Sequence, residues 1–397
     1  MTDTAAADRS PWAVFLIFLR LGLTAFGGPI AHLGYFREEF VTRRQWLSER
    51  SYADLVALCQ FLPGPASSQV GIAIGLSRSG YAGALAAWAG FTLPSALALI
   101  LFALGLAHYA DVVPAGVLHG LKVVAVAVVA QAVWGMARTL CPDAPRISLM
   151  AAATALVLLL PSVWGQLIVI ALSAMLGLWL FKPQPGSIHE PLPIPVRRQA
   201  GVLWLLLFLA LLLGLPLLAT WVADPTLARV DAFYRSGSLV FGGGHVVLPL
   251  LQAEVVPTGW VSRDTFLAGY GAAQAVPGPL FTFSAFLGAS MNQAPSGWLG
   301  GFICLLAIFT PSFLLVVGAV PFWELLRRHS RTQAALAGIN AAVVGLLLAA
   351  LYHPVWTSAI QTPQDFVLAL VALVALMVWK LPPWLVVLGC GTIGWIL

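Results

Sequence analysis

The sequence reads Gln60-Phe61-Leu62-Pro63-Gly64-Pro65 in the middle of a hydrophobic stretch, and the pattern returns as Gln274-Ala275-Val276-Pro277-Gly278-Pro279. An α-helix cannot pass a Pro-Gly-Pro triplet intact, because proline lacks the N–H donor and its ring clashes with the preceding turn. Two broken helices at matching places in two halves of a chain are typical of a transporter whose binding site lies on an internal repeat. The triplets therefore predict both the fold class and the place of the functional site.

The composition predicts an all-α polytopic membrane protein embedded in a lipid bilayer. Hydrophobic residues make up 60% of the 397 residues and charged residues only 9%, whereas a soluble domain has about 25% charged residues. The net charge of +5 is modest and does not indicate nucleic-acid binding. The polar tail 1–10 leads into an apolar run without a cleavage site, so we expect no signal peptide. The cysteines are isolated in apolar surroundings and are expected to be packing residues: Cys59, Cys141, Cys304 and Cys390.

The two halves of the chain match over much of their length, which predicts an internal repeat. At an offset of 215 residues, Arg20 matches Arg235, Phe26-Gly27-Gly28 matches Phe241-Gly242-Gly243, and Glu39 matches Glu254. At an offset of 214, Trp46 matches Trp260 and the two triplets coincide. Further matches follow at Pro94 with Pro311 and at Gly120 with Gly338. Matches at Trp, Arg, Glu and Pro are not expected from two merely hydrophobic sequences.

Apolar runs of about 20 residues predict about 13 transmembrane segments. Residues 1–181 form the N-terminal repeat, residues 182–228 a linker with one extra helix, and residues 229–397 the C-terminal repeat. The predicted spans are 12–26, 52–77 (broken), 82–107, 113–138, 147–160, 163–181, 200–222, 229–241, 265–291 (broken), 298–323, 333–352, 365–379 and 382–397.

The extra helix makes the number of crossings before the second repeat odd, so the two repeats are expected to have opposite orientation. Loop charges agree: the loops predicted outside, near 108–112, 161–162, 292–297 and 353–364, contain no lysine or arginine. Residues 27–51 do not fit, because they fall outside and yet contain four arginines. This segment is either an interfacial helix or folds back into the membrane. The predicted inside loops contain Arg9, Arg78, Arg138, Arg146, Lys182, Arg197, Arg198, Arg263, Arg327, Arg328, Arg331 and Lys380.

Arg20 lies within the first predicted span of the first half, and its counterpart Arg235 within that of the second half. A charge inside a membrane span usually faces a cavity or a partner, although both side chains could instead reach a nearby interface. The guanidinium offers several donors in a planar fork that suits a tetrahedral oxyanion. We therefore predict both arginines as substrate contacts.

The half-helices that follow the triplets expose free backbone N–H groups and the positive end of a helix dipole, which together suit an anion. The alternative is a pair of proline kinks satisfied by neighbouring helices. The predicted substrate contacts in the first half are Gly27, Gly28, Gln60, Pro63, Gly64, Pro65, Ala66, Ser67 and Ser68. In the second half they are Gly242, Gly243, Gly244, Gln274, Pro277, Gly278, Pro279, Leu280 and Phe281.

Other titratable residues give weaker predictions. Lys122 lies in a predicted span and could hold the anion or pair with a carboxylate, and the matched carboxylates Glu39 and Glu254 are candidates for proton coupling or are ordinary surface acids. His32 and His245 titrate in a useful range but do not align. We find no Walker A loop, no catalytic motif and no metal-spaced Cys/His set, so we expect no cofactor, no metal and no enzyme activity.

The paired motifs resemble the long-chain, two-domain form of the chromate ion transporter family over nearly the whole chain. They are Phe26-Gly27-Gly28-Pro29, the two Gln-x-x-Pro-Gly-Pro segments, Phe241-Gly242-Gly243-Gly244-His245 and Gly338-Ile339-Asn340-Ala341. The resemblance implies a multi-pass protein of a bacterial inner membrane that expels chromate, with halves of opposite orientation and proton-linked exchange. It leaves open sulfate or another oxyanion taken up by a carrier, an anion channel, a membrane-bound reductase, and a homodimeric assembly.

Membrane energetics favour export of such an anion. One charge moved across 100 mV is worth about 2.3 kcal/mol, so a dianion that leaves a negative-inside cell gains about 4.6 kcal/mol. Export therefore needs no ATP, whereas uptake needs coupled cations.

Overall fold

The structure, a computed structural model, describes residues 10–109, 114–160, 162–181, 194, 196–241, 243–323 and 330–396. This part of the chain contains helices and no strand. Gly242 and most of the linker after residue 181 lie outside the described residues.

Five of the described helices are long and apolar enough to cross a membrane. They are α5 (Ala66–His108), α6 (Ala115–Leu140), α9 (Arg198–Val222), α14 (Gly297–Ala319) and α16 (Ser330–Ala350). The chain is therefore a polytopic membrane protein. Shorter apolar helices accompany them: α2 (Pro11–Thr24), α7 (Ala144–Leu159), α8 (Val163–Leu180), α18 (Pro363–Met377) and α19 (Pro383–Ile396).

The chain folds back along α2 after the first glycine break. Phe18 in the middle of α2 packs on Phe36 and Phe40, with ring centroids 5.6 and 5.1 Å apart. These partners lie on α3 (Gly28–Arg37) and on the π-helical turn η1 (Glu38–Arg43) that continues it. The reversal falls at Gly27 and Gly28, whose φ angles of +100° and +75° are open mainly to glycine.

This reversal corrects the expected place of residues 27–51. Sequence reasoning put them on the side opposite the N-terminus, because it counted α2 as a full crossing. The aromatic contacts instead return the segment along α2, so its arginines lie on the side where the chain starts. The segment folds back, which was one of the two alternatives left open.

A second hairpin follows in the same direction. It consists of α4 (Glu49–Phe61), the first triplet, and the first arm of α5, which ends at the kink formed by Ser79 and Gly80. The guanidinium of Arg78 at this kink lies 4.4 Å from the ring centroid of Trp46, which lies at the open end of the first hairpin, opposite its turn. Both hairpins therefore start and end at one face and turn back at the glycine break and the triplet.

The second half repeats this arrangement. Its first hairpin joins α10 (Pro225–Ser238) through the 3-10 turn η2 (Gly244–Val246) to α11 (Val247–Val255). Its second joins α12 (Arg263–Ala273) to the 3-10 turn η3 (Leu280–Thr282) and α13 (Phe283–Ala289). The N–H of Asn292, just after α13, donates at 3.0 Å to the carbonyl of Trp260, which lies at the open end of the first hairpin of this half, opposite its turn. Both hairpins of this half thus also reach one common face.

The long second arm of α5 and α14 lie side by side and run in opposite directions. A Cβ atom built on Gly297 would lie 3.7 Å from Leu104, near the end of α5. At the other end of the pair, Tyr81 of α5 and Val317 of α14 line one groove. The hairpins of the first half therefore lie at one end of α5, and those of the second half at the other end.

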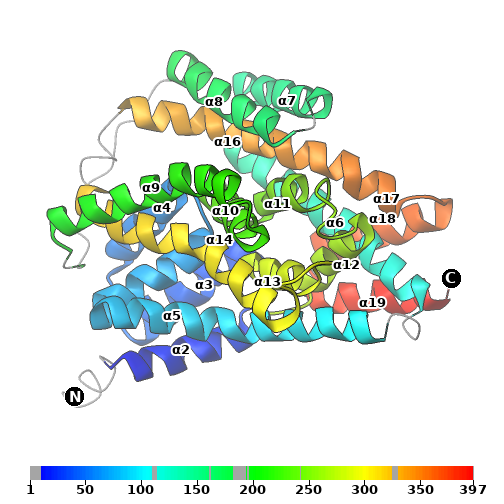
Figure 1. The fold of residues 1–397 in the computed structure, drawn as a ribbon, viewed down its shortest axis with the longest axis horizontal. Helices are drawn as coiled ribbons and strands as arrows, with labels where there is room; N and C mark the ends of the chain where they lie inside the picture. Colours follow the sequence, from blue (N-terminus) through cyan, green and yellow to red (C-terminus); the bar gives the residue numbers. More distant parts are fainter. Residues whose placement is uncertain are drawn as a thin grey trace.

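Each half also exchanges a helix pair with the other. In Figure 1, α7 and α8 of the first half lie on α16 of the second, and α19 lies beside α6. Gly338 of α16 packs against the Ser173 carbonyl on α8, and Gly120 of α6 against the Cys390 carbonyl on α19. A side chain at either glycine would prevent this close approach. The remaining short elements are η4 (Val320–Phe322), η5 (Leu351–Trp356) and α17 (Thr357–Ala359).

Candidate functional site

Each triplet is bound to the glycine break of the opposite half. The N–H of Gly64 donates to the carbonyl of Val240 at 2.7 Å, and the N–H of Gly278 donates to the carbonyl of Ala25 at 3.0 Å. Ala25 and Val240 occupy matching positions at the offset of 215 residues, and each precedes its own glycine break. The two hydrogen bonds are therefore counterparts of each other, and they join the halves in the middle of the protein.

Only glycine fits the centre of each triplet. Gly64 has a φ of +124° and Gly278 a φ of +105°, a region that other residues rarely adopt. A Cβ atom would lie 2.9 Å from the Ser312 hydroxyl at Gly64 and 2.8 Å from the Ser95 hydroxyl at Gly278. Proline on both sides and glycine between thus hold the triplet in a shape that fits the opposing helix.

The two glycine breaks face each other. A Cβ atom on Gly28 would lie 4.0 Å from Nε2 of His245, and one on Gly244 would lie 3.2 Å from the ring of Pro29. Small residues at these places let backbone from both halves surround a common space.

That space is a cavity of about 60 Å³. It is large enough for several water molecules. Its walls come from the first glycine break, the residue after the second, the second triplet and its flanks, α6 and α19. They are Gly27, Gly28, Pro29, Val128, Gln131, His245, Ala273, Gln274, Val276, Gly278, Leu280 and Pro383.

The cavity offers neutral hydrogen-bonding groups and no charged side chain. Its polar side chains are Gln131, His245 and Gln274. Nε2 of Gln274 is buried and has no hydrogen-bond partner. Leu280 begins the helical segment after the triplet, where the first backbone N–H groups have no partner within the helix. These donors, together with the positive end of the helix, favour an anion in the cavity.

The orientation of His245 is fixed from behind. Its Nδ1 lies 2.8 Å from the hydroxyl of the buried Tyr270 on α12. Nε2 therefore remains on the side of the cavity and Gly28. It donates to an anion when Nδ1 accepts the tyrosine proton.

Five of the predicted contacts line the cavity: Gly27, Gly28, Gln274, Gly278 and Leu280. Gly243 and Gly244 adjoin it, and Pro277, Pro279 and Phe281 flank Gly278 and Leu280 on the chain. Gly242 lies outside the described residues.

The first triplet does not line the cavity. Pro63, Gly64, Pro65 and Ala66 are not among its walls. Gly64 instead donates its N–H to Val240, and Gln60, the counterpart of Gln274, is exposed. Ser67 lies 3.4 Å from Nδ1 of His32, whose Nε2 lies 3.2 Å from the same Ala25 carbonyl that Gly278 binds. Ser68 is buried, and its hydroxyl has no partner. The cavity is thus one-sided, although the backbone around it is nearly symmetric.

None of the predicted cations faces the cavity. Arg20 is exposed on α2. Arg235 lies 3.1 Å from Asp231 and 3.0 Å from Glu254, so two carboxylates occupy its guanidinium. Lys122 pairs with Asp264 at 3.0 Å and links α6 to the start of α12. The predicted role of Arg20 and Arg235 as substrate contacts does not fit these positions.

The two matched carboxylates differ in their surroundings. Glu39 accepts hydrogen bonds from Arg43 and Arg44, both at 2.7 Å. Glu254 shares the single Arg235 with Asp231. Burial raises the pKa of the Glu254 carboxyl to about 7, against the opposing effect of Arg235. The second half therefore holds a carboxylate that can take up a proton near neutral pH.

Sequence reasoning ranked His245 low and did not single out Gln131 or Pro29. His245 directly follows the second glycine break, and Pro29 directly follows the first. Gln131 is the uncharged polar residue in the otherwise apolar stretch 123–136. A position next to a glycine break was thus a usable signal for a cavity residue. Matching the two halves was not, because it favours residues that occur in both halves.

Comparison with known families identifies the chain. The family model described as "Chromate transporter" matches residues 12–178 and 227–395. The chain belongs to the chromate transporter family. The two matched regions each contain one glycine break and one triplet, so the family model covers every residue that lines the cavity.

Several relatives in the family are similar over nearly their whole length. The chain is 27% identical to a chromate transport protein of Pseudomonas aeruginosa, with 100% of this chain and 94% of the relative covered. It is 28% identical to a probable chromate transport protein of Synechococcus elongatus, over 92% of this chain and 88% of the relative. A chromate transport protein of Cupriavidus metallidurans is 24% identical, over 96% and 91% of the two chains. No solved structure matches the chain.

Proposed function

We propose that this chain is a secondary transporter that carries chromate, or a tetrahedral oxyanion of the same class, out of a bacterial cell across the inner membrane. The observation that carries the proposal is the crosswise binding of each Pro-Gly-Pro triplet to the opposite glycine break around a buried cavity with neutral donors. The names of the relatives from Pseudomonas and Cupriavidus support chromate as the substrate.

Neutral donors suit an anion that must be released again. A fixed arginine in a cavity of low dielectric would bind a dianion strongly and would slow its exit. The amide of Gln274, the imidazole of His245 and the free N–H groups at Leu280 surround the anion without a permanent opposing charge. The helix dipole supplies the positive potential.

The two halves act as inverted repeats, with residues 1–181 and 229–397 joined by α9. Their hairpins enter from opposite faces and meet at the cavity, which suits alternating access by movement of one half against the other. Because both hairpins of each half return to the face on which they start, four of the predicted 13 spans are not crossings. Among the described helices, nine complete crossings remain, by α5, α6, α7, α8, α9, α14, α16, α18 and α19.

This topology agrees better with the loop charges than the original expectation. With the N-terminus in the cytoplasm, the basic segment 27–51 now lies inside. Arg263 becomes the basic residue on the outer side, next to Asp264.

Export is favoured by the membrane potential, at about 4.6 kcal/mol for a dianion across 100 mV. Glu254 is the candidate for proton coupling, because it is half-buried and shares its arginine with Asp231. Protonation of Glu254 would leave Arg235 paired with Asp231 alone, and this alters the contact between α10 and α11.

Transport of labelled chromate in proteoliposomes tests the proposal. Inside-out vesicles with a positive-inside potential should accumulate chromate, and sulfate should compete with it. Gln274→Ala should raise KM at least tenfold, while the matched variant Gln60→Ala, at the exposed counterpart, should transport like the wild type. Equal KM values for the two variants would remove the cavity from the substrate path. Sulfate accumulation without chromate transport would establish the sulfate carrier instead, and flux that does not saturate would establish a channel.

A further inference from the structure

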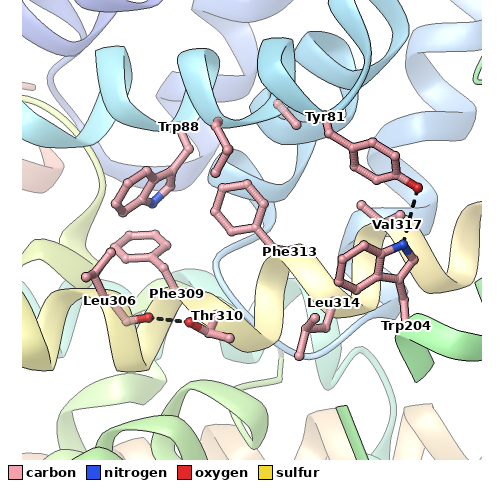
Figure 2. Close-up of a pocket in the computed structure, with 11 residues that line it drawn as sticks. Tyr81, Trp88, Trp204, Leu306, Phe309, Thr310, Phe313, Leu314 and Val317 are labelled. Carbon is pink, nitrogen blue, oxygen red and sulfur yellow. Dashed lines mark hydrogen bonds between the residues drawn. The ribbon is translucent and has the colours of Figure 1, made fainter. Parts of the chain in front are cut away.

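A groove between α5, α9 and α14 has no part in the proposed anion path. It has a volume of about 350 Å³, which lies in the range of ligand pockets. Its wall is almost wholly apolar and rich in aromatic rings (Figure 2). Trp88, Phe309 and Phe313 pack together at one end, with ring centroids 5.7 and 5.8 Å from Trp88.

The groove opens toward the bilayer. All three helices that form it are long and apolar enough to cross a membrane, and the most apolar 18-residue stretch of α9 is only 11% buried. Leu85 of α5 and Leu306 of α14 line the groove and are 55% and 53% exposed. Lipid hydrocarbon is therefore in direct contact with the opening.

One end of the groove is polar. Nε1 of Trp204 donates to the hydroxyl of Tyr81 at 3.2 Å, and Figure 2 shows this pair at the end away from Trp88. Tyrosine and tryptophan pairs of this kind favour the level of the lipid headgroups. The groove therefore extends from the headgroup level into the hydrocarbon.

Basic residues gather at this polar end. Arg78 precedes Tyr81 across the kink of α5. Arg197 and Arg198 are exposed at the start of α9, about 9 Å along the helix from Trp204. The N-terminus of α9 adds the positive end of a helix dipole, and Arg197 there makes no side-chain capping bond. In the proposed topology this face is cytoplasmic, where the leaflet is rich in anionic lipids.

We propose that the groove binds one anionic phospholipid, with an acyl chain between α5, α9 and α14 and the phosphate beside Arg78, Arg197 and Arg198. The apolar wall suits the acyl chain of the lipid, and the arginines suit the negative charge of its headgroup. The lipid fills the space between the repeats and the linking helix α9. This site is separate from the anion cavity and does not depend on which oxyanion is transported.

Native mass spectrometry of the full chain, released from nanodiscs of equal phosphatidylglycerol and phosphatidylcholine, tests the site. The wild type should retain phosphatidylglycerol at a ratio at least threefold above phosphatidylcholine. Leu306→Trp places an indole in the groove and should reduce retained lipid at least threefold. Leu299→Trp is the matched control, because Leu299 lies on the same helix, is 64% exposed and does not line the groove. It should retain lipid like the wild type.

The double variant Arg197→Gln and Arg198→Gln distinguishes binding of the acyl chain from binding of the headgroup. It should still retain lipid, with the phosphatidylglycerol preference reduced toward one. Equal retention by Leu306→Trp and Leu299→Trp would overturn the groove as the site. Equal retention of the two lipids by the wild type would overturn the anionic headgroup. Intrinsic fluorescence melting curves of all variants confirm that each is folded before the spectra are compared.

Discussion

The N–H of Gly278 donates to the carbonyl of Ala25 at 3.0 Å, although the two residues lie 253 positions apart in the sequence. Its counterpart joins Gly64 to Val240 at 2.7 Å. The broken helix of each half is thus held by backbone of the other half. An unpaired backbone group buried at this depth would be costly, so the two halves satisfy each other where their helices are interrupted.

A methyl group at either triplet should break this contact. Gly278→Ala would put a Cβ atom 2.8 Å from the Ser95 hydroxyl at a φ of +105°, so we expect a loss of about 1–3 kcal/mol of stability and at least tenfold in transport. Gly64→Ala should behave alike. Melting temperature and chromate uptake measure both effects. Gly214→Ala in α9 is the control, because no atom lies within 4 Å of its added Cβ; normal uptake by Gly278→Ala would mean that the triplet tolerates displacement.

The two matched arginines should respond differently to removal. Arg20 is exposed, so Arg20→Ala should transport within twofold of the wild type. Arg235→Ala would leave the buried Asp231 and the half-buried Glu254 without a cation, which should destabilise the protein by about 3–5 kcal/mol. Thermal unfolding and uptake on the same preparations separate the two cases. A large KM increase in Arg20→Ala with an unchanged melting temperature would return Arg20 to the substrate path.

The Glu254 carboxyl should make stability depend on pH with a defined sign. Its pKa is raised from 4.5 to about 7, so between these values the folded protein holds a proton that the unfolded chain has released. Stability therefore falls as pH rises from about 4.5 to 7. Glu254→Gln should flatten this slope in melting curves and remove the dependence of transport on a pH gradient. Glu49→Gln, at an exposed carboxylate, should change neither.

Cysteines introduced at the open ends of the two first hairpins should react with maleimide from opposite sides of the membrane. Thr42 and Thr258 are exposed at the open ends of the first hairpin of the first half and of the second half, respectively. In the proposed topology, an impermeant maleimide should label Thr258→Cys in intact spheroplasts and Thr42→Cys only after lysis. The native cysteines give little background, because all four are buried. Labelling of both sites in intact spheroplasts would contradict the folding back of α3 along α2.

The sequence predicted the helices well and their paths less well. Hydrophobic length placed the second arm of α5 and the helices α6, α9 and α14 close to their observed bounds, because each must bury backbone in lipid. It counted α2 as a crossing, because fourteen apolar residues look alike in a crossing helix and in one arm of a hairpin. The fold-back depends on Phe18 meeting Phe36 and Phe40, and such tertiary contacts leave no periodic signal.

The site was predicted in part for a similar reason. Gly27, Gly28, Gln274 and Gly278 could be found, because proline and glycine breaks are visible in the sequence and have a direct backbone meaning. The arginines were assigned by charge alone, and Asp231, which helps to neutralise Arg235, lies one helical turn away on the same helix. A carboxylate four residues from a buried arginine was therefore a usable sign that the charge is already paired.

The exchange of helix pairs determines when the cavity can form during synthesis. A membrane protein emerges from its N-terminus, but α6, which contributes Gln131, is covered by α19, the last helix of the chain. Until α19 arrives, Gly116 and Gly120 lack the backbone against which they pack. The cavity can therefore be completed only after the fourteen-residue helix α19 has been synthesised. A chain truncated before Pro383 would lack one wall of the cavity.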